Sequence, residues 1–336
     1  MSTFWKYLKI AQNILCVSAI FSGIIYAGIY INNITHEKKE IVQNNQNLII
    51  PENKTLIDIQ TLKHPFLTTY WGLWSQNIKL EEIPSWFNVI LVSFAEIGSG
   101  GAINFDNNNY NLMKSIESAH LKNQIVLLSV GGGANCVGGL FNDQTFGRQD
   151  FNENIFIDSV LSTVNIYNFD GVDIDYECYS TFNNTRKQND INVVSATKNL
   201  RNRLQNKLLT WAAFSSVWTT NSFADYRTAY LKILEYIDYV FWMTYNVSKD
   251  DIVANEWYSL VESRISELNF NTSKICYGYC IGDGCSYGIG PSDSQVLKWA
   301  QSRGQCLFLW DIDSEVKLAG SIGNLENSLS HAAAVS

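Results

Sequence analysis

The chain has 336 residues, of which 24 are basic and 32 acidic, so its formal net charge is −8. Apolar residues make up 46% of the chain and charged residues 17%, which excludes a mainly disordered protein and predicts a large buried core. The acidic balance argues against a nucleic-acid partner, because proteins that bind the phosphate backbone present a basic patch. The 10 Trp, 17 Tyr and 17 Phe residues supply many flat apolar faces, which either core packing or a sugar-binding cleft can use.

An uncharged apolar segment at residues 10–31 comes first in the chain. A helix of this length spans the roughly 30 Å hydrocarbon core of a bilayer. Lys6 and Lys9 precede it, so the positive-inside rule places residues 1–9 in the cytoplasm and the rest of the chain outside. We therefore predict a membrane-anchored protein whose exported domain is extracellular, periplasmic or lumenal. The alternatives are a cleaved signal peptide, which would give a secreted protein, and a buried core helix, which would show a polar face.

Residues 32–64 are rich in Asn, Gln, Lys and Glu, and this composition predicts a polar stalk. Residues 65–336 remain for the folded part. That length suits one domain, and it is close to the roughly 250 residues typical of a (β/α)8 barrel.

Within residues 65–336, short β-branched and aromatic runs alternate with longer mixed stretches. The eight predicted strands are Phe66–Tyr70, Val89–Ala95, Gln124–Val130, Gly171–Tyr176, Leu208–Ala213, Tyr239–Thr244, Lys274–Tyr279 and Gly304–Leu309. The predicted helices are Tyr110–Lys122, Asn152–Asn165, Asn192–Gln205, Asn255–Leu268 and Asp293–Ser302. Asp150 with Glu153, and Ser292 with Gln295, have the spacing of capping boxes for two of these helices.

Eight strand–helix units predict an α/β protein with a closed parallel (β/α)8 TIM barrel. An open doubly wound sheet is the alternative. Such a sheet normally carries a Gly-rich phosphate loop after its first strand, and the turn at Tyr70–Trp74 is not such a loop.

Three carboxylates alternate with apolar residues along the fourth predicted strand. Asp173, Asp175 and Glu177 therefore share one face, which in a parallel barrel is the interior. Buried like charges repel, so we expect proton sharing and at least one raised pKa, as a general acid requires. Glu177 comes last and would lie at the barrel mouth. The alternatives are an antiparallel edge strand with a polar face in solvent and an Asp-x-Asp metal site. We predict no metal and no cofactor, because no further ligands accompany the acids.

Six cysteines follow the apolar segment, and in an exported chain they predict up to three disulfides. Zinc is the alternative, but the four histidines are scattered and no paired Cys-x-x-Cys is present. The predicted order of strands around the barrel favours three pairs, which are Cys136–Cys178, Cys276–Cys306 and Cys280–Cys285.

Several motifs then resemble one family. The run Asp170–Glu177 matches the D-G-x-D-x-D-x-E signature of the family 18 glycoside hydrolases, the chitinase family. Ser129–Gly133 resembles the S-x-G-G turn of that family, and Met243–Asn246 resembles its M-x-Y-D motif. Trp310 resembles the tryptophan beneath the scissile sugar, and Tyr70–Gly72 resembles the first strand of the hevamine-like branch. The resemblance covers roughly residues 65–313, and it implies the barrel fold.

The resemblance implies hydrolysis of the β-1,4 bonds of an N-acetylglucosamine polymer, chitin, by a retaining and substrate-assisted mechanism. Glu177 would protonate the glycosidic oxygen. Asp175 would hold the acetamido N–H of the substrate, and Asp173 would share the proton of Asp175. Tyr245 would donate its hydroxyl to the acetamido oxygen, and Trp310 would support the distorted sugar.

Tyr70, Met243 and Asn246 complete the substrate-binding residues that the resemblance implies. Asn246 departs from the commoner Asp, but the hevamine-like branch also has Asn there. The short connection 280–303 leaves no room for the insertion that walls a tunnel in some members, so an open groove and endo-type cleavage are expected. We expect a monomer whose partners are the glycan and, through residues 10–31, a membrane.

Two other functions remain open. An endo-β-N-acetylglucosaminidase acting on N-glycans would carry the same motif and differ only in the loops of its groove. A non-catalytic glycan-binding barrel usually loses the Glu or one Asp of the motif, whereas Asp173, Asp175 and Glu177 are all present here.

Overall fold

The computed structural model describes residues 62, 66–105, 111–133, 150–177, 184–214, 232–245, 263, 266, 270–280 and 304–320. By its contacts the chain divides into two units, Met1–Leu56 and Ile57–Ser336, and every described residue belongs to the second. The predicted anchor at 10–31 lies outside the described residues, and so does almost all of the predicted stalk. Among the residues that are described, no helix combines the length and the apolar character needed to cross a bilayer.

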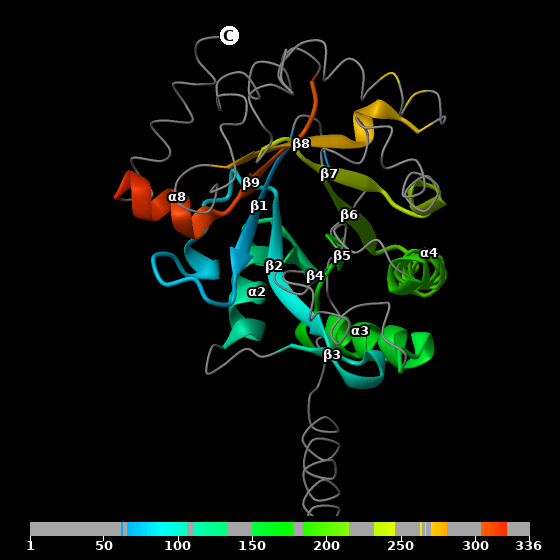
Figure 1. Cartoon of the computed structure of the whole chain (residues 1–336). Coiled ribbons are helices and arrows are strands. Elements are labelled where there is room, and N and C mark those ends of the chain that lie inside the picture. Colours follow the sequence, from blue (N-terminus) through cyan, green and yellow to red (C-terminus); the bar gives the residue numbers. More distant parts are fainter. Residues whose placement is uncertain are drawn as a thin grey trace, which may run out of the picture. The chain divides into compact units, whose positions relative to one another are not determined.

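Eight parallel strands of the described part close into a barrel (Figure 1). These strands are β1 (Leu67–Gly72), β2 (Val89–Ile97), β4 (Ile125–Gly131), β5 (Gly171–Asp175), β6 (Leu208–Phe214), β7 (Tyr239–Met243), β8 (Ile275–Cys280) and β9 (Leu307–Trp310). Each pairs with its neighbours in chain order, and β1 pairs in parallel with both β2 and β9. That last pairing closes the sheet, so the barrel prediction is confirmed and the open doubly wound alternative is wrong.

Every predicted strand overlaps an observed one. Strand β3 (Ile103–Asn104), which pairs antiparallel with the end of β2, was not predicted. Two residues are too few to show an alternating pattern. The chain between these two strands forms the short 3-10 helix η3 (Ser99–Gly101).

Four α-helices have described bounds, and residues 232–234, 263 and 266 are helical as well. The four helices are α2 (Leu112–Leu121), α3 (Glu153–Tyr167), α4 (Asn184–Leu204) and α8 (Ile312–Ala319). The 3-10 helices η2 (Leu80–Glu82) and η8 (Thr272–Lys274) precede β2 and β8. The predictions for α2 and α3 are confirmed, α4 begins eight residues earlier than predicted, and α8 was not predicted. The predicted helix 293–302 lies outside the described residues, as does most of 255–268.

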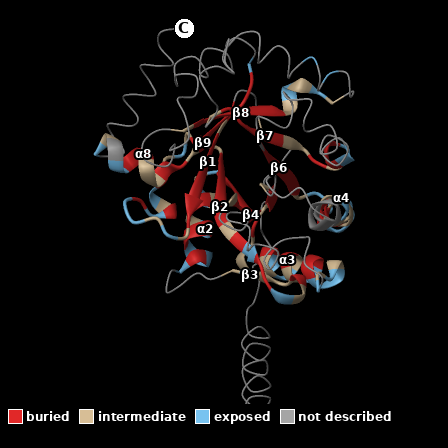
Figure 2. Ribbon diagram, viewed as in Figure 1, coloured by how far each residue is buried: buried red, intermediate tan, exposed pale blue. Residues whose placement is uncertain are grey.

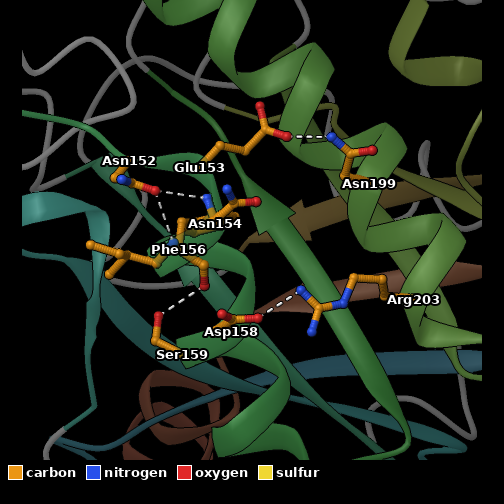
Figure 3. Close-up of polar contacts among 9 residues, drawn as sticks. Asn152, Glu153, Asn154, Phe156, Asp158, Ser159, Asn199 and Arg203 are labelled. Atoms are coloured by element: carbon orange, nitrogen blue, oxygen red, sulfur yellow. Dashed lines mark hydrogen bonds and ion pairs between the residues drawn. The ribbon is translucent and has the colours of Figure 1, made fainter.

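The cap of α3 differs from the predicted one. Asn152 is the N-cap, and its side-chain oxygen accepts hydrogen bonds from the backbone N–H groups of Asn154, at 3.0 Å, and Ile155, at 3.2 Å (Figure 3). Asp150 instead accepts a hydrogen bond from the backbone N–H of Gly100 at 2.9 Å. The predicted cap is wrong because the helix begins two residues later than that box requires.

Helices α3 and α4 lie side by side and are joined by polar contacts (Figure 3). Asn199 donates a hydrogen bond to Glu153, and Arg203 pairs with Asp158 at 2.7 Å. The side chains of Arg203 and Asp158 are 49% and 64% exposed. An ion pair this exposed contributes at most about 1 kcal/mol, so its residues can be changed with little effect on the fold.

Buried side chains form two layers, one inside the barrel and one between the barrel and its helices. The barrel strands are buried along most of their length, whereas the helices keep an exposed outer face (Figure 2). Val172, Ile174 and Tyr176 belong to the outer layer. The alternating residues Asp173 and Asp175 are 0% and 5% exposed. The prediction that the acidic residues of this strand face away from the helices is therefore confirmed.

One predicted disulfide is confirmed in the inner layer. Cys276, in β8, and Cys306, just before β9, are bonded with their Cα atoms 4.5 Å apart, and both are fully buried. Cys280 is also disulfide-bonded, and its predicted partner Cys285 lies outside the described residues. The predicted pair Cys136–Cys178 lies outside them as well.

Candidate active site

The fourth barrel strand, β5, brings acidic residues to the carboxyl end of the barrel. Asp173 is deepest, Asp175 ends the strand, and Glu177 follows two residues later. Strand β4 lies alongside, with Ser129 in register with Asp173 and Gly131 in register with Asp175.

Hydroxyl groups from three other strands surround Asp173. One carboxylate oxygen accepts hydrogen bonds from the hydroxyls of Tyr70, at 3.0 Å, and Ser129, at 2.8 Å, and the other accepts from the hydroxyl of Thr210 at 2.7 Å. Burial raises the pKa of Asp173, and these hydrogen bonds oppose that rise. A buried carboxylate with both oxygens bonded in this way is held in one orientation.

Asp175 differs from Asp173 in its partners. Its Oδ1 atom is buried and accepts no hydrogen bond within the described part of the chain. Burial raises the pKa of Asp175 well above its usual value, and the charges of Glu177 and Asp173 raise it further. A buried polar oxygen normally has a partner, so Oδ1 is available to a hydrogen-bond donor from a bound molecule.

Glu177 has the protonation behaviour of a general acid. Burial raises its pKa to about 7, although a hydrogen bond from the backbone of Gly133 lowers it. Near neutral pH the carboxyl group therefore exists in both protonation states, which suits a group that first gives and then takes a proton.

Two tyrosines complete the polar part of the site. Burial raises the pKa of Tyr245 well above its usual value, and the charges of Glu177 and Asp175 add to this rise. Burial also raises the pKa of Tyr70, followed by the charge of Asp173. Both side chains therefore remain neutral hydroxyl donors. Tyr70 is 1% exposed and donates to Asp173, so it belongs to the acidic network.

Aromatic rings from β1, β2 and β9 lie next to the acids. The ring of Trp310 stacks on Phe94, with centroids 5.8 Å apart, and meets Tyr70 edge-on at 5.1 Å. Phe94 also contacts Trp74 at 5.9 Å, and Trp74 is 52% exposed. Phe94 and Trp74 were not predicted as site residues. The sequence signal for Trp74 was its position, as a large aromatic residue in the polar turn after the first predicted strand.

The remaining predicted site residues are placed as follows. Met243 ends β7 and is 6% exposed, within the inner layer of the barrel. Asn246 lies outside the described residues. Asp311, which was not predicted, caps α8 by accepting a hydrogen bond from the backbone N–H of Ser314 at 2.9 Å. Its charge helps to raise the pKa of Tyr245, so it lies close to the site.

A glycine turn after β4 lets the backbone approach the acids closely. A Cβ atom on Gly131 would lie 2.1 Å from the carbonyl oxygen of Asp175, and the N–H of Gly132 donates to that same oxygen at 2.9 Å. A Cβ on Gly133 would lie 3.1 Å from Oε1 of Glu177. The turn therefore requires residues without side chains to hold Asp175 and Glu177 in place.

Replacing Gly131 with Ala is expected to destabilise the protein more than replacing Gly304 with Ala. Both glycines have positive φ, of 117° and 61°, which costs Ala about 1–2 kcal/mol. Nothing lies within 4 Å of the added Cβ at Gly304, whereas at Gly131 overpacking adds roughly 1–3 kcal/mol. Urea denaturation of the two variants measures the difference in the free energy of unfolding. Equal losses of stability would show that the backbone moves away from the added Cβ at Gly131 without an energetic cost.

Metal binding gets no support from the described residues, among which no group of three His, Cys, Asp or Glu side chains is arranged to hold an ion. The chemistry that these side chains offer is proton transfer by Glu177, together with hydrogen bonding by Asp175 and Tyr245 to a bound molecule.

Comparisons with known proteins agree with this geometry. The family model described as glycosyl hydrolases family 18 matches residues 67–285. Chitinase D of Niallia circulans is 29% identical over 188 residues, which is 50% of this chain and 34% of that protein. The chain thus aligns with about a third of that relative's length.

Solved structures show the same fold. A putative chitinase A of Streptomyces coelicolor superposes with a TM-score of 0.59 at 19% identity, covering 80% of this chain and 99% of the other. A family 18 chitinase of Pseudoalteromonas aurantia gives 0.58 at 22% identity, covering 74% and 95%.

Proposed function

Because the chain belongs to glycosyl hydrolases family 18, we propose that it hydrolyses the β-1,4 bonds of chitin or of a related N-acetylglucosamine polymer. The observation that carries this proposal is the pairing of Glu177, whose pKa is about 7, with the unpartnered oxygen of the neighbouring Asp175. The names of the relatives, chitinases in each case above, support the same substrate.

The proposed first step is protonation of the glycosidic oxygen by Glu177, while the bond from that oxygen to the anomeric carbon breaks. The acetamido oxygen of the substrate attacks the anomeric carbon, which gives a cyclic oxazolinium intermediate. Water then opens this ring and passes its proton to Glu177, now a base. Two displacements at one carbon give net retention.

Asp175 and Tyr245 would hold the reacting acetamide from both ends. The free Oδ1 of Asp175 accepts the acetamido N–H, and the neutral hydroxyl of Tyr245 donates to the acetamido oxygen. Asp173 is held in one orientation by three hydroxyls. It would share the proton of Asp175 as the charge on the acetamide changes. We propose that Tyr70 acts through Asp173 and not by direct contact with the sugar.

We propose that the aromatic rings bind the sugar chain. Trp310 is only partly buried and lies against Tyr70, which itself contacts Asp173, so it suits the sugar at the scissile bond. Trp74, half exposed and linked to Trp310 through Phe94, suits a sugar further along the chain. Four expectations stay predictions. They are the substrate contacts of Met243 and Asn246, endo-type cleavage, the monomeric state and the closeness to the hevamine-like branch.

A substrate comparison tests the proposal. Wild-type protein should cleave chitin hexasaccharide with retention, and the cellulose hexasaccharide, which lacks the attacking acetamide, should be nearly inert. Preferential release of high-mannose glycans from a glycoprotein would favour the endo-β-N-acetylglucosaminidase alternative. Tight binding of the chitin oligomer without cleavage would favour the non-catalytic one.

The rate of cleavage should fall as the pH rises above about 7. Only the protonated form of Glu177 can donate to the leaving oxygen, and its pKa is about 7. Above that value the protonated fraction drops tenfold per pH unit, so kcat/KM at pH 9 should be about a hundredfold below its plateau. A pH profile with a soluble chitin oligomer measures this, and a rate that is constant up to pH 9 would rule out Glu177 as the acid.

We propose that residues 10–31 anchor the protein in a membrane with the hydrolase domain outside the cytoplasm, on the charge pattern described above. Protease added to intact spheroplasts should then remove the domain. Full protection would contradict this topology, and release of the domain into the medium without protease would indicate a cleaved signal peptide.

A further inference from the structure

The turn that follows β1 is held by a residue from the other end of the chain. Asp313 lies in the first turn of α8, and its Oδ1 atom accepts hydrogen bonds from the backbone N–H groups of Gln76, at 2.9 Å, Asn77, at 2.6 Å, and Ile78, at 3.2 Å. Its Oδ2 atom accepts a further bond from the side-chain amide of Asn77 at 2.8 Å. Three successive N–H groups converging on one oxygen form an anion-binding nest, which here is filled by a carboxylate of the same chain.

The same turn is also fastened to the strand before it. The indole N–H of Trp71 donates to the carbonyl oxygen of Ile78 at 3.0 Å, and the N–H of Ser75 donates to Gly72 at 2.9 Å. Helix α8 contacts β1 directly (Figure 1). The segment 72–78 is therefore fixed from within by Trp71 and from α8 by Asp313.

Trp74 is the large side chain that this segment presents. Its indole folds back over Gly72, where an added Cβ would lie 2.3 Å from the ring, and it meets Phe94 at a ring-centroid distance of 5.9 Å. The side chain is nevertheless 52% exposed. Part of the indole is thus supported by protein and the rest is open to solvent, so its usefulness for stacking depends on how well the segment is held.

We propose that Asp313 is a positioning residue for substrate binding, which clamps the segment 72–78 to α8 and thereby keeps the indole of Trp74 in place to bind a sugar of a long chain. The proposal rests on the proposed function, because it assumes that a sugar chain follows the aromatic rings. Asp313 holds the segment through four hydrogen bonds and, in the proposal, acts on the sugar through that segment.

The physical basis is preorganisation. Without the carboxylate, the N–H groups of Gln76 and Asn77 can bond to water, because both residues are exposed, whereas Ile78 is buried. The barrel should therefore stay folded while the turn gains freedom. Substrate binding must then order the turn, and each side chain so ordered weakens binding by roughly twofold to tenfold. Only substrates long enough to use Trp74 should suffer this loss.

The test compares two substrate lengths. In Asp313→Ala, kcat/KM for chitin hexasaccharide should fall roughly fivefold to tenfold through KM, with kcat and the rate on a fluorogenic chitobioside nearly unchanged. Asp313→Asn keeps an acceptor oxygen without the charge and should lie between Ala and wild type. Asp158→Ala removes a carboxylate from the exposed ion pair between α3 and α4, and kcat/KM should stay at the wild-type value for both substrates.

Coupling to Trp74 decides the route by which Asp313 acts. Trp74→Ala should reproduce the loss on the hexasaccharide, and adding Asp313→Ala to it should cost little more. Losses that add in full, or an equal loss on both substrate lengths, would overturn the proposal.

Amide hydrogen exchange provides a readout that does not depend on activity. The N–H groups of Gln76, Asn77 and Ile78 should exchange faster in Asp313→Ala than in wild type, while those of β5 should not change. If wild-type protein cleaves neither substrate, the proposed function fails, and exchange still decides the clamp: unchanged protection of these three amides would overturn it.

Discussion

Replacing Glu177 with Gln should slow the cleavage of a chitin oligomer by at least about 10²–10⁴-fold, because the amide cannot donate the proton that the leaving oxygen needs. The two side chains have nearly the same shape, so the barrel should stay folded. Burial raises the pKa of Glu177 above its usual value, so the ionised carboxylate destabilises the fold at high pH, and replacing it with Gln should raise the free energy of unfolding there.

Single-turnover rates and oligosaccharide affinity measure the two parts of this expectation separately. Affinity for chitin hexasaccharide should remain within severalfold of wild type. Glu153→Gln is the matched control, because Glu153 lies on α3 and bonds only to Asn199 among the contacts described above. Cleavage by the Glu177→Gln protein at the wild-type rate would remove Glu177 from the mechanism.

The barrel was predictable because each strand carries a local pattern. Strand β5 shows this best, since alternation along 172–177 sorted apolar from acidic residues before any pairing was known. Elements without such a pattern were missed. Strand β3 is two residues long, and α8 is a helix of eight residues whose cap, Asp311, directly follows the last strand.

The acidic centre of the site was also predictable, because one short motif contains all three carboxylates. Its surroundings were not, because they join distant parts of the chain. Tyr70 and Thr210 reach Asp173 from 103 and 37 residues away, and Asp313 reaches the turn after β1 across more than 230 residues. Sequence periodicity contains no information on such pairs.

The different environments of Asp173 and Asp175 follow from the strands that a closed barrel places side by side. Three hydroxyls from β1, β4 and β6 meet at Asp173, while Asp175, two residues closer to the mouth, keeps an oxygen that has no partner among the described residues. One carboxylate is therefore fixed by the protein and the next is available to the substrate. This difference explains why a strand with two buried acids is tolerated, since hydrogen bonds offset part of the cost of burying the first.

Removing the disulfide between Cys276 and Cys306 should lower the free energy of unfolding by about 3–4 kcal/mol, the value expected when a closed loop of this length is opened. The two residues are 30 positions apart and fully buried in the inner layer of the barrel. The double variant Cys276→Ala/Cys306→Ala is the cleanest test, because it leaves neither a free thiol nor a buried hydroxyl.

Catalysis should survive this change at temperatures where the double variant remains folded. Cys276 lies near the start of β8 and Cys306 just before β9, whereas the proposed catalytic acids Asp175 and Glu177 lie at and beyond the carboxyl end of β5, the opposite end of a parallel barrel. Urea denaturation and kcat at 20 °C measure the two quantities. A loss of stability below about 1 kcal/mol would show that the bond constrains the unfolded chain little. A large fall in kcat of the folded variant would show that the two ends of the barrel are coupled.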